Sequence, residues 1–381
     1  MNFSSIHVSH YVGVHKMDIN RARTGYEKVL AHRVGYPFAQ EAKEDGKVIF
    51  ADPMKKLIKV QYKSGNIEAF KYGEEYTNMG GGGFYCTQEM VNNDFAVGDK
   101  VKKGDIVTFN KNFFAKDLNS KQVIWKFGRL STTAFVEADG TLDDANMISG
   151  DVARDLGFNP VHVRDVNLDI STNVHMYAAV GTNVANIDPI VIYDQAAMDE
   201  SMFGKLDADA VKLLTRLNRA TPKAKFSGKI VKIEAFYKCS LSDMSPSLRK
   251  LVQTINKDIE AMQKEVSDSI NKLAFEQTSN IQHSDRIGMN DIDETNIILR
   301  FYIQQEMGVN PGDKLEWGGS SKSVCARVVP EGWKTEDGTQ VDSLFSYLGI
   351  SNRIVLSPIR MGLVNSIMSE LEKQIIDEYY S

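Results

Sequence analysis

Two lysines lie eight residues apart in the segment PGDKLEWGGSSKS, which covers residues 311–323. Lys314 and Lys322 each carry a compact positive charge on a flexible stem, and such a group binds a phosphate oxygen as a point charge. The segment is therefore a candidate site for a negatively charged partner. The simplest alternative is that both lysines are solvated side chains of a surface loop.

The segment GGSSKS does not fit a phosphate-binding P-loop. That motif needs a glycine directly before the lysine and another glycine five residues earlier, so that backbone N–H groups surround the phosphates. Here Ser321 precedes Lys322, and no helical pattern follows. A P-loop is therefore excluded as the source of any phosphate binding.

Three of the seven histidines, His7, His10 and His15, lie close together in the sequence, in the alternating run IHVSHYVGVH. The other histidines are scattered along the chain. Alternation of this kind predicts a β-strand with a polar face at the edge of a sheet. A metal site would need further His, Cys or carboxylate ligands at defined spacing, and the sequence offers none that can be named. The edge strand is the favoured interpretation.

The composition excludes several classes of protein. The chain has 381 residues, enough for two or three compact units, and 42% of them are hydrophobic. Its net charge of −5 gives no overall attraction to nucleic acid, so any polyanion site must be local or shared with other chains. The three cysteines are far apart, which favours a reducing compartment. Neither a leader peptide nor a membrane-spanning run is predicted.

The chain reads as strands, then a long insertion that contains helices, then strands again. Residues 1–120 and 122–150 consist mostly of short β-branched and aromatic runs separated by turn signals. The run VGDKVKKGDIVTF (97–109) predicts a strand pair around a Lys-Lys-Gly turn. Hairpins of this kind occur in lipoyl and biotinyl carriers, but no lysine here has the flanks that a modified carrier lysine needs.

Three long helices are predicted, at residues 205–220, 246–277 and 359–379, and a short helix is predicted at DVARDLGF (151–158). In the second, apolar residues are spaced 3, 4, 4, 3, 4, 4 and 3 apart, so that one apolar stripe follows the helix almost straight. Pro246 suits the first turn of this helix. The stripe is expected to pack against a neighbouring segment of the protein.

Four landmarks occur in order near the lysines. They are GDK at 312–314, the lysine at 322, DGTQVD at 337–342 and LGISNR at 348–353. This order resembles the GDK-(8)-K block of the β subunit of multisubunit RNA polymerases, in which GDK is followed by RHGNKG, a DGTPVD turn and LGVPSR.

Other segments share the resemblance. AFVEADGTLDDANMIS (134–149) is similar to the family's AF-(4)-GYNFEDAIVIS stretch, and VGDKVKKGDIV (97–107) is similar to its VGDRVEKGDVL hairpin. DINRARTG, near residue 20, resembles DANRALMG. The resemblance extends from about residue 15 to about residue 360, and it is strongest at 134–149 and 312–353.

The resemblance implies a mixed, mainly β fold. It predicts a double-psi β-barrel with an α/β flap-like insertion and an N-terminal region that resembles a barrel-sandwich hybrid. The implied domains are an N-terminal region at 1–121, the first half of the barrel at 122–158, the insertion at 159–292, the second half of the barrel at 293–360, and a C-terminal helix at 361–381.

The resemblance also implies the roles of individual residues. It predicts that Lys314 and Lys322 lie beside the RNA 3′ end and the phosphates of the incoming nucleotide, and that Arg353 binds the triphosphate. Asp143 and Asp144 match an acidic pair near the second, nucleotide-borne Mg²⁺. The catalytic Mg²⁺ would be held mainly by a β′-type partner, which fits the lack of a DFDGD-like motif in this sequence. From the residues alone, a plain polar turn after Gly140 is the favoured interpretation of Asp143-Asp144.

The sequence departs from the family at several supporting positions. The family's RHGN is GGSS here (318–321), so an arginine and a histidine that buttress the loop are absent, and Asp143 stands where the family has Glu. The main charges are retained, while the residues around them differ. The resemblance therefore implies the same role for the charged residues, held by different surrounding side chains.

The extent of the resemblance suggests the C-terminal fragment of a split β subunit, as in the RNA polymerases of large (jumbo) bacteriophages. Such a subunit would be inactive alone. Its partners would be a β N-terminal fragment, β′-type subunits, a promoter-specificity factor, template DNA, RNA and nucleoside triphosphates, with no membrane. It would act in the cytoplasm of an infected bacterial host or in the virion. The alternative is a non-catalytic scaffold or nucleic-acid-binding structural protein that keeps the barrel.

Overall fold

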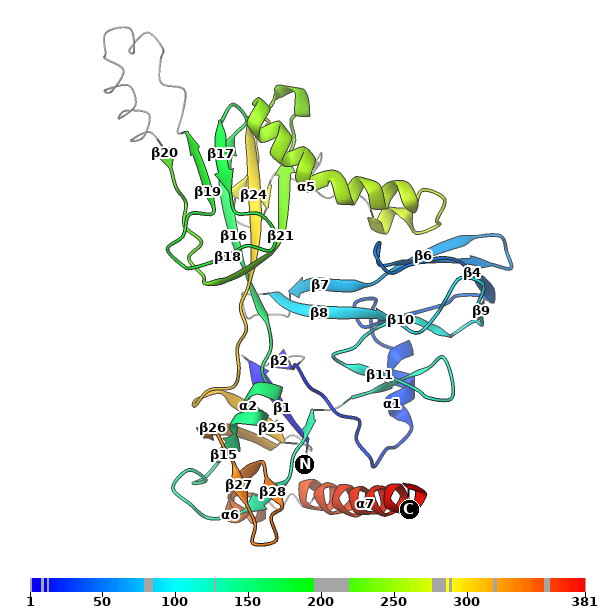
Figure 1. The fold of residues 1–381 in the computed structure, drawn as a ribbon, viewed down its shortest axis with the longest axis vertical. Helices are drawn as coiled ribbons and strands as arrows, with labels where there is room; N and C mark the ends of the chain where they lie inside the picture. Colours follow the sequence, from blue (N-terminus) through cyan, green and yellow to red (C-terminus); the bar gives the residue numbers. More distant parts are fainter. Residues whose placement is uncertain are drawn as a thin grey trace. The chain divides into compact units, whose positions relative to one another are not determined.

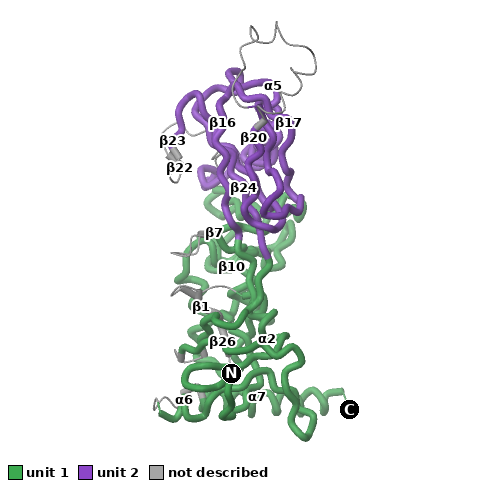
Figure 2. Tube along the Cα trace, turned by 90° about the vertical axis from the view of Figure 1, so that its left-hand side faces the viewer, with its two compact units in different colours: residues 1–160, 306–381 green, residues 161–305 purple. Residues whose placement is uncertain are grey.

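A computed structural model gives the fold of the chain, which is mainly β (Figure 1). The structure describes residues 2–7, 10–11, 14–78, 85–126, 128–194, 219–275, 286–287, 290–317, 321–352 and 357–380. The chain divides into two compact units, and Figure 2 colours them green and purple. Unit 1 comprises residues 1–160 and 306–381, and unit 2 comprises residues 161–305.

The principal sheet of unit 1 combines strands from both ends of the chain. Its strands, in spatial order, are β13 (Arg129–Leu130), β1 (Asn2–His7), β25 (Lys314–Trp317), β26 (Ser321–Val329), β15 (Ala145–Ser149), β29 (Ser343–Phe345) and β14 (Thr133–Phe135), with β2 (His10–Tyr11) paired to β1. The pairs β15–β26 and β14–β29 are parallel, while the other pairs are antiparallel.

This sheet is curled. The two strands at its ends, β13 and β14, are joined by residues 131–132 alone, so the two edges of the sheet must come close together. The result is a half-barrel whose inner side is filled by buried residues such as Ile148, Leu315 and Cys325. A curled sheet of this kind is compatible with a β-barrel fold.

Residues 39–125 form a second group of strands in unit 1. One antiparallel set comprises β6 (Ile67–Lys71), β5 (Leu57–Tyr62), β4 (Gly46–Asp52) and β9 (Lys100–Val101). Another comprises β7 (Gly73–Asn78), β8 (Tyr85–Asn92), β10 (Ile106–Asn110) and β3 (Ala39–Glu41). Two short pairs complete unit 1, namely β11 (Phe114–Lys116) with β12 (Val123–Trp125), and β27 (Trp333–Lys334) with β28 (Gln340–Val341).

The hairpin predicted at 97–109 is only half correct. Both strands exist, and a turn with Gly104 in the left-handed region joins them. However, β9 pairs with β4, whereas β10 pairs with β3 and β8. Because β3 and β8 occupy the two edges of β10, no edge of β10 is left to pair with β9.

The helices of unit 1 are short except for the last one. They are α1 (Tyr26–Val29), the 3₁₀ turn η1 (Leu30–His32), α2 (Gly150–Asp155), α6 (Tyr347–Ser351) and α7 (Ser357–Tyr380). Ser149 caps α2 by accepting a hydrogen bond from the N–H of Val152. The helix predicted at 359–379 is thus present as α7.

Unit 2 contains a sheet of long strands covered by a helix. The strand order is β18 (Asn183–Val184), β21 (Gly228–Tyr237), β24 (Asn296–Gln304) and β16 (Pro160–Asp169), all antiparallel. Unit 2 also contains a three-stranded sheet of β17 (Val174–Tyr177), β19 (Val191–Asp194) and β20 (Arg219–Ala220), and a strand pair of β22 (Arg286–Ile287) and β23 (Asn290–Asp291). Its helical elements are α5 (Pro246–Glu265) and the 3₁₀ turns η3 (Leu241–Asp243) and η4 (Lys272–Phe275).

The prediction for α5 is correct at its start and wrong at its end. Ser245 caps the helix and Pro246 occupies its first turn, but the helix ends at Glu265 instead of continuing to residue 277. Ile270 and Leu273, the last members of the expected stripe, are 52% and 69% exposed. The physical reason is the Ser-Asp-Ser run at 267–269, because such side chains bond to nearby backbone groups and favour turns. The Ser267 hydroxyl indeed donates to the Lys264 carbonyl.

The helix predicted at 205–220 lies almost wholly outside the described residues. Its last two residues, Arg219 and Ala220, form β20. In the part of the chain that the structure describes, no helix combines the length and the apolar character needed to cross a membrane.

Candidate functional site

The register of β25 and β26 puts the two lysines on the same side of the sheet. Lys314 lies opposite Val324, and Lys322 lies opposite Glu316. Residues that face each other in an antiparallel pair project to the same face, and so do residues two apart in one strand. Lys314 and Lys322 are therefore diagonal neighbours on one face, and both are exposed.

The other face of this strand pair fixes the register. Leu315 and Ser323 lie opposite each other and are buried, and Cys325 is fully buried next to them. A shift of one residue would move these side chains into water and turn both lysines into the core. Burial on one face of the strand pair thus holds the two lysine charges on the other.

A tight turn leads the chain into Lys314. Gly312 has a φ of 97°, which favours glycine, and its N–H donates to the Cys325 carbonyl at 2.7 Å. The carboxylate of Asp313 accepts a hydrogen bond from the Asn310 N–H at 2.8 Å, and the Asp313 carbonyl accepts one from Cys325. The Gly-Asp pair in GDK therefore positions the first lysine.

The acidic pair lies at the start of β15, next to β26. The N–H of Val324 donates to the Asp144 carbonyl at 2.9 Å. This hydrogen bond joins the backbone of the acidic pair to β26, two residues after Lys322. Asp143 is exposed and has a φ of 54°. A Cβ on Gly349 would come within 2.7 Å of the Asp143 carbonyl, so this approach requires glycine. The structure thus brings the neighbourhood of Asp143-Asp144 to the lysine-bearing strand.

The acidic pair by itself does not make a complete metal cage. Across the described residues, no group of three or more His, Cys, Asp or Glu side chains is arranged to hold a metal ion. Mg²⁺, however, often binds through one or two carboxylates together with substrate phosphates and water. The adjacent carboxylates of Asp143 and Asp144 are oxygen donors of the type and number that such a phosphate-bound ion takes from a protein.

Two predicted parts of the site lie outside the described residues. Arg353 is one, and most of the GGSS segment (318–320) is the other. The described chain reaches Asn352, which follows α6. The placement of Arg353 relative to the lysines therefore stays a prediction.

Glu137 is a residue of this region that the sequence interpretation did not single out. Its carboxylate accepts hydrogen bonds from the Leu348 N–H at 3.0 Å and the Ser346 hydroxyl at 2.9 Å. Ser346 in turn caps α6 by accepting from the Gly349 N–H. The hydrogen bond from the Leu348 backbone, with help from Ser346, lowers the pKa of Glu137. Glu137 thus ties the start of α6 to the segment that leads into the acidic pair.

A second unanticipated contact links β15 and β26 inside the sheet. The Asn146 side-chain amide donates to the Ser323 hydroxyl at 2.5 Å, and both residues are buried. A buried polar pair of this kind favours one alignment of two strands over alternatives. In the sequence, the only indication of this contact is an asparagine among the apolar residues of ANMI (145–148).

The histidine cluster contributes no site in the part of the chain that is described. His7 and His10 pair across β1 and β2, and their side chains are outside the described set. His15 follows the strands, and its backbone N–H donates to the Gly157 carbonyl. The alternating run therefore forms two short strands instead of one.

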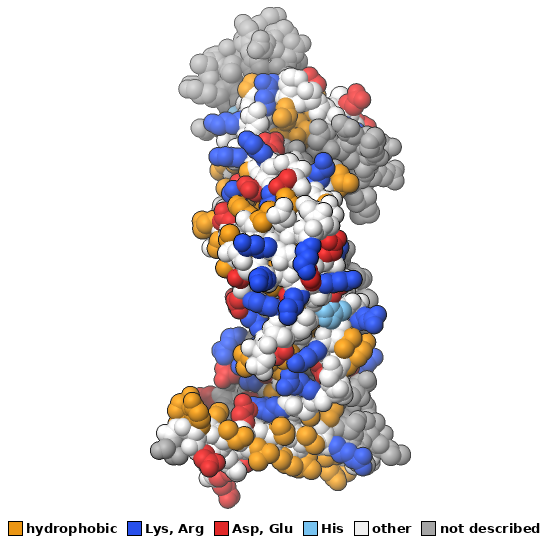
Figure 3. All heavy atoms as spheres, turned by 90° about the vertical axis from the view of Figure 1, so that its right-hand side faces the viewer, with side chains coloured by type: hydrophobic (Ala, Val, Ile, Leu, Met, Phe, Trp, Pro, Cys, Tyr) orange, Lys and Arg blue, Asp and Glu red, His pale blue; other side chains and the backbone are white. Residues whose placement is uncertain are grey.

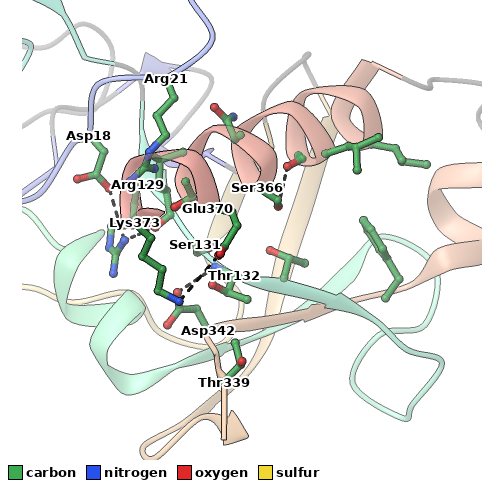
Figure 4. Close-up of a pocket in the computed structure, with 18 residues that line it drawn as sticks. Asp18, Arg21, Arg129, Ser131, Thr132, Thr339, Asp342, Ser366, Glu370 and Lys373 are labelled. Carbon is green, nitrogen blue, oxygen red and sulfur yellow. Dashed lines mark hydrogen bonds and ion pairs between the residues drawn. The ribbon is translucent and has the colours of Figure 1, made fainter. Parts of the chain in front are cut away.

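A pocket of about 760 Å³ lies elsewhere in unit 1 (Figure 4). Its walls are β13, β14 and the inner side of α7, from which Ser366, Glu370 and Lys373 point toward the strands. Arg129 is held there by Asp155 at 2.7 Å and by Asp18 at 3.4 Å. None of the predicted site residues lines this pocket, so it is separate from the lysine site.

Comparison with known proteins gives a distant but long match. The chain is 22% identical to the DNA-directed RNA polymerase subunit beta of Streptococcus pneumoniae over 340 residues, which is 88% of this chain and 25% of that protein. The match to the same subunit of Streptococcus agalactiae serotype V is 22% over 339 residues. Along most of its length the chain is similar to bacterial β subunits.

The same comparison sets the scope of this similarity. The chain spans about a quarter of the length of the curated β subunits that it matches. No family model matches the sequence. The resemblance recognised from the landmarks at 134–149 and 312–353 is therefore supported as a distant relationship to the β type.

Proposed function

We propose that the chain is a β-type subunit of a multisubunit DNA-dependent RNA polymerase and forms one side of its nucleotidyl-transfer site. The observation that carries the proposal is the pair Lys314 and Lys322 on one exposed face, in a chain similar to β subunits over 88% of its length. In this role the curled sheet of unit 1 is a double-psi β-barrel and the strands up to residue 121 form the hybrid-like region. The segment 159–292 is the flap-like insertion, and 361–381 is the C-terminal helix.

The proposed chemistry uses fixed positive charge. Phosphoryl transfer needs reactants held in line and developing charge on phosphoryl oxygens offset, rather than covalent participation of the protein. Lys314 and Lys322 would bind oxygens at the RNA 3′ end and on the nucleoside triphosphate, and Arg353 would hold two triphosphate oxygens with its guanidinium group. All three act by binding and orientation.

Mg²⁺ is the proposed cofactor. Asp143 and Asp144 would hold the ion that arrives with the nucleotide, and the β′-type partner would hold the other. When bound, the ions neutralise phosphate charge and orient the attacking and leaving oxygens. The exposure of Asp143 supports access for a metal–nucleotide complex.

The proposed partners follow from the same role. They are a β N-terminal fragment, β′-type subunits, a promoter-specificity factor, template DNA, RNA and nucleoside triphosphates. The split β arrangement of jumbo bacteriophages and a location in the infected bacterial cytoplasm or the virion are part of this proposal. Such an assembly would be active where the isolated chain is inactive.

The test compares elongation by the purified assembly that contains Lys314→Ala, Lys322→Ala or a control, Lys334→Ala, which alters an exposed lysine of β27. Loss of one positioned phosphate contact is expected to slow elongation about 10²- to 10³-fold. The control should transcribe at the unaltered rate. Unaltered elongation by both site variants would remove the proposed role of these lysines.

Co-purification separates the polymerase from the scaffold alternative. A polymerase subunit should be recovered with a chain that bears a DFDGD-type metal motif. A scaffold protein should be recovered without such a chain, and its assembly should not transcribe.

A further inference from the structure

The helix α7 exposes an apolar face that unit 1 does not cover. Val364, Ile367, Met368, Leu371 and Ile375 are all exposed large hydrophobic residues of this one helix. Figure 3 shows hydrophobic side chains gathered along the lower edge of the molecule, at the height of α7 in Figure 1. Single exposed apolar residues are normal on a protein surface, but a contiguous set marks an interaction surface.

These five residues lie on one side of the helix. With 3.6 residues per turn, they fall within an arc of about 100°. Gly362, Ser366, Ser369 and Lys373, which line the pocket, fall on the opposite side. The helix therefore turns mainly small and polar residues to its own unit and leaves this apolar arc uncovered. Leu363, Ile376, Tyr379 and Tyr380 are further exposed apolar residues of α7 outside the arc.

The polar side is firmly attached to unit 1. Asn365 is only 6% exposed, and its side-chain carbonyl accepts a hydrogen bond from the Ala22 N–H at 3.5 Å. Arg21 pairs with Glu372 at 2.9 Å, and Ile359 packs against the main core of the unit. A rotation that buried the apolar side against unit 1 would break these contacts.

The charges of α7 indicate what covers its apolar side. The second half of the helix carries Glu370, Glu372, Asp377 and Glu378 against a single lysine, Lys373. Arg21 pairs with Glu372, and Lys373 lies 4.0 Å from Glu370, so the acidic residues remain in excess by about two. A second copy would bring acidic residues to acidic residues, and anionic lipid would be repelled for the same reason. A groove flanked by Lys and Arg would be attracted.

We propose that the outward face of α7 docks into an apolar groove, flanked by basic residues, on another polypeptide of the same assembly. The proposal rests on the proposed function only in taking that polypeptide to be a polymerase subunit. The surface itself is defined by the exposed apolar arc and by the net negative charge of the second half of the helix.

A photo-crosslinking amino acid at position 371 or 375 of the full chain, in the purified assembly, tests the proposal. Mass spectrometry should locate the crosslink on a Lys- or Arg-flanked apolar segment of a different polypeptide. Position 118, where Leu118 is 97% exposed in unit 1 outside α7, serves as the control and should not label that segment. A crosslink to a second copy, to another part of this chain, or to nothing overturns the proposal.

A charge insertion gives an independent measurement. The double variant Leu371→Asp/Ile375→Asp should bind the crosslinked partner at least about tenfold more weakly, since charges at the centre of an apolar interface remove its principal contacts. Both positions are exposed, so the chain itself should fold. Leu118→Asp should bind as the unaltered chain does, and equal binding by the double variant would overturn the proposal.

The outcomes also distinguish this inference from the proposed function. An assembly that transcribes but gives no crosslink from position 371 or 375 retains the polymerase function and loses the docking surface. A crosslink to a basic-flanked partner in an assembly that does not transcribe retains the docking surface and loses the polymerase function.

Discussion

At the scale of single residues, the site is governed by which face of a strand pair a side chain occupies. Lys314 and Lys322 are exposed because Leu315 and Ser323, their neighbours in sequence, are buried. Glu316 lies directly opposite Lys322 on the same face. In the proposed function, the Glu316 carboxylate would therefore compete with a phosphate for the charge of Lys322.

Replacement of Glu316 by Gln tests this competition. Opposite charges facing each other across a strand pair contribute roughly 0.2–1 kcal/mol. Without the carboxylate, Lys322 should bind a nucleotide phosphate more strongly, and the KM for nucleoside triphosphate in the assembled enzyme should fall about 1.5- to 5-fold. Glu331→Gln, at an exposed position in the turn before β27, is the control and should leave KM unchanged. A raised KM in the Glu316 variant would contradict the competition.

The cysteines provide a second prediction at this scale. All three are free, and burial raises the pKa of Cys86 and Cys325 to about 11 each. At pH 8 about one in a thousand of these thiols is then ionised, and the thiolate is the reactive form. Cys239 is half-buried. Iodoacetamide should therefore modify Cys239 first, as followed by peptide mass spectrometry, while all three should react in urea. Rapid labelling of Cys325 in the native protein would refute its burial in the curled sheet.

At the scale of elements, the start of α6 is held partly by a side chain that is distant in sequence, Glu137. The helix α6 has five residues, too few to be stable alone, and it depends on Ser346 and Glu137 at its start. Its last residues lead toward Arg353. Weakening the cap should therefore alter the segment that carries this arginine.

Glu137 predicts a pH dependence. Its pKa in the folded chain is below the usual value, so its stabilising contribution is present above about pH 4.5 and is lost as the pH falls through the lowered pKa. Hydrogen exchange of residues 346–352, corrected for intrinsic rates, should lose protection below that pH. Glu137→Gln should show weaker protection already at pH 7 and little further change on acidification. An unchanged acid response in this variant would assign the effect to another group.

At the scale of the whole molecule, each unit has its own hydrophobic core. In unit 1 the larger cluster includes Phe114 and Ile148, and in unit 2 the cluster includes Leu248 and Phe301. None of the buried residues is shared between these clusters. A truncation in one core is therefore expected to weaken the strands packed against that core first.

Core truncation tests this expectation. Phe301 is fully buried, and Phe301→Ala should cost about 3–5 kcal/mol of the unfolding free energy of unit 2. Hydrogen exchange should then accelerate in β16, β21 and β24 and stay unchanged in β15 and β26. Phe114→Ala, in the unit 1 core, should give the opposite pattern. Simultaneous loss of protection in both units would show one cooperative body.

The sequence by itself determined the features that depend on neighbouring residues. Alternating and β-branched runs predicted most strands, Pro246 predicted the start of α5, and the apolar spacing predicted α7, because these patterns act within a few residues along the chain. The order of GDK, the second lysine, DGTQVD and LGISNR also indicated the β-type relationship without any structure.

The tertiary structure decided which segments meet. It separated β9 from β10, attached Glu137 to α6, and left the apolar arc of α7 uncovered. It also put Lys314 and Lys322 on one face. Each of these outcomes depends on contacts between segments that are not neighbours in the sequence. Such contacts decide which side chains of each segment are buried and which stay exposed. A local sequence pattern does not say which other segment will make the contact.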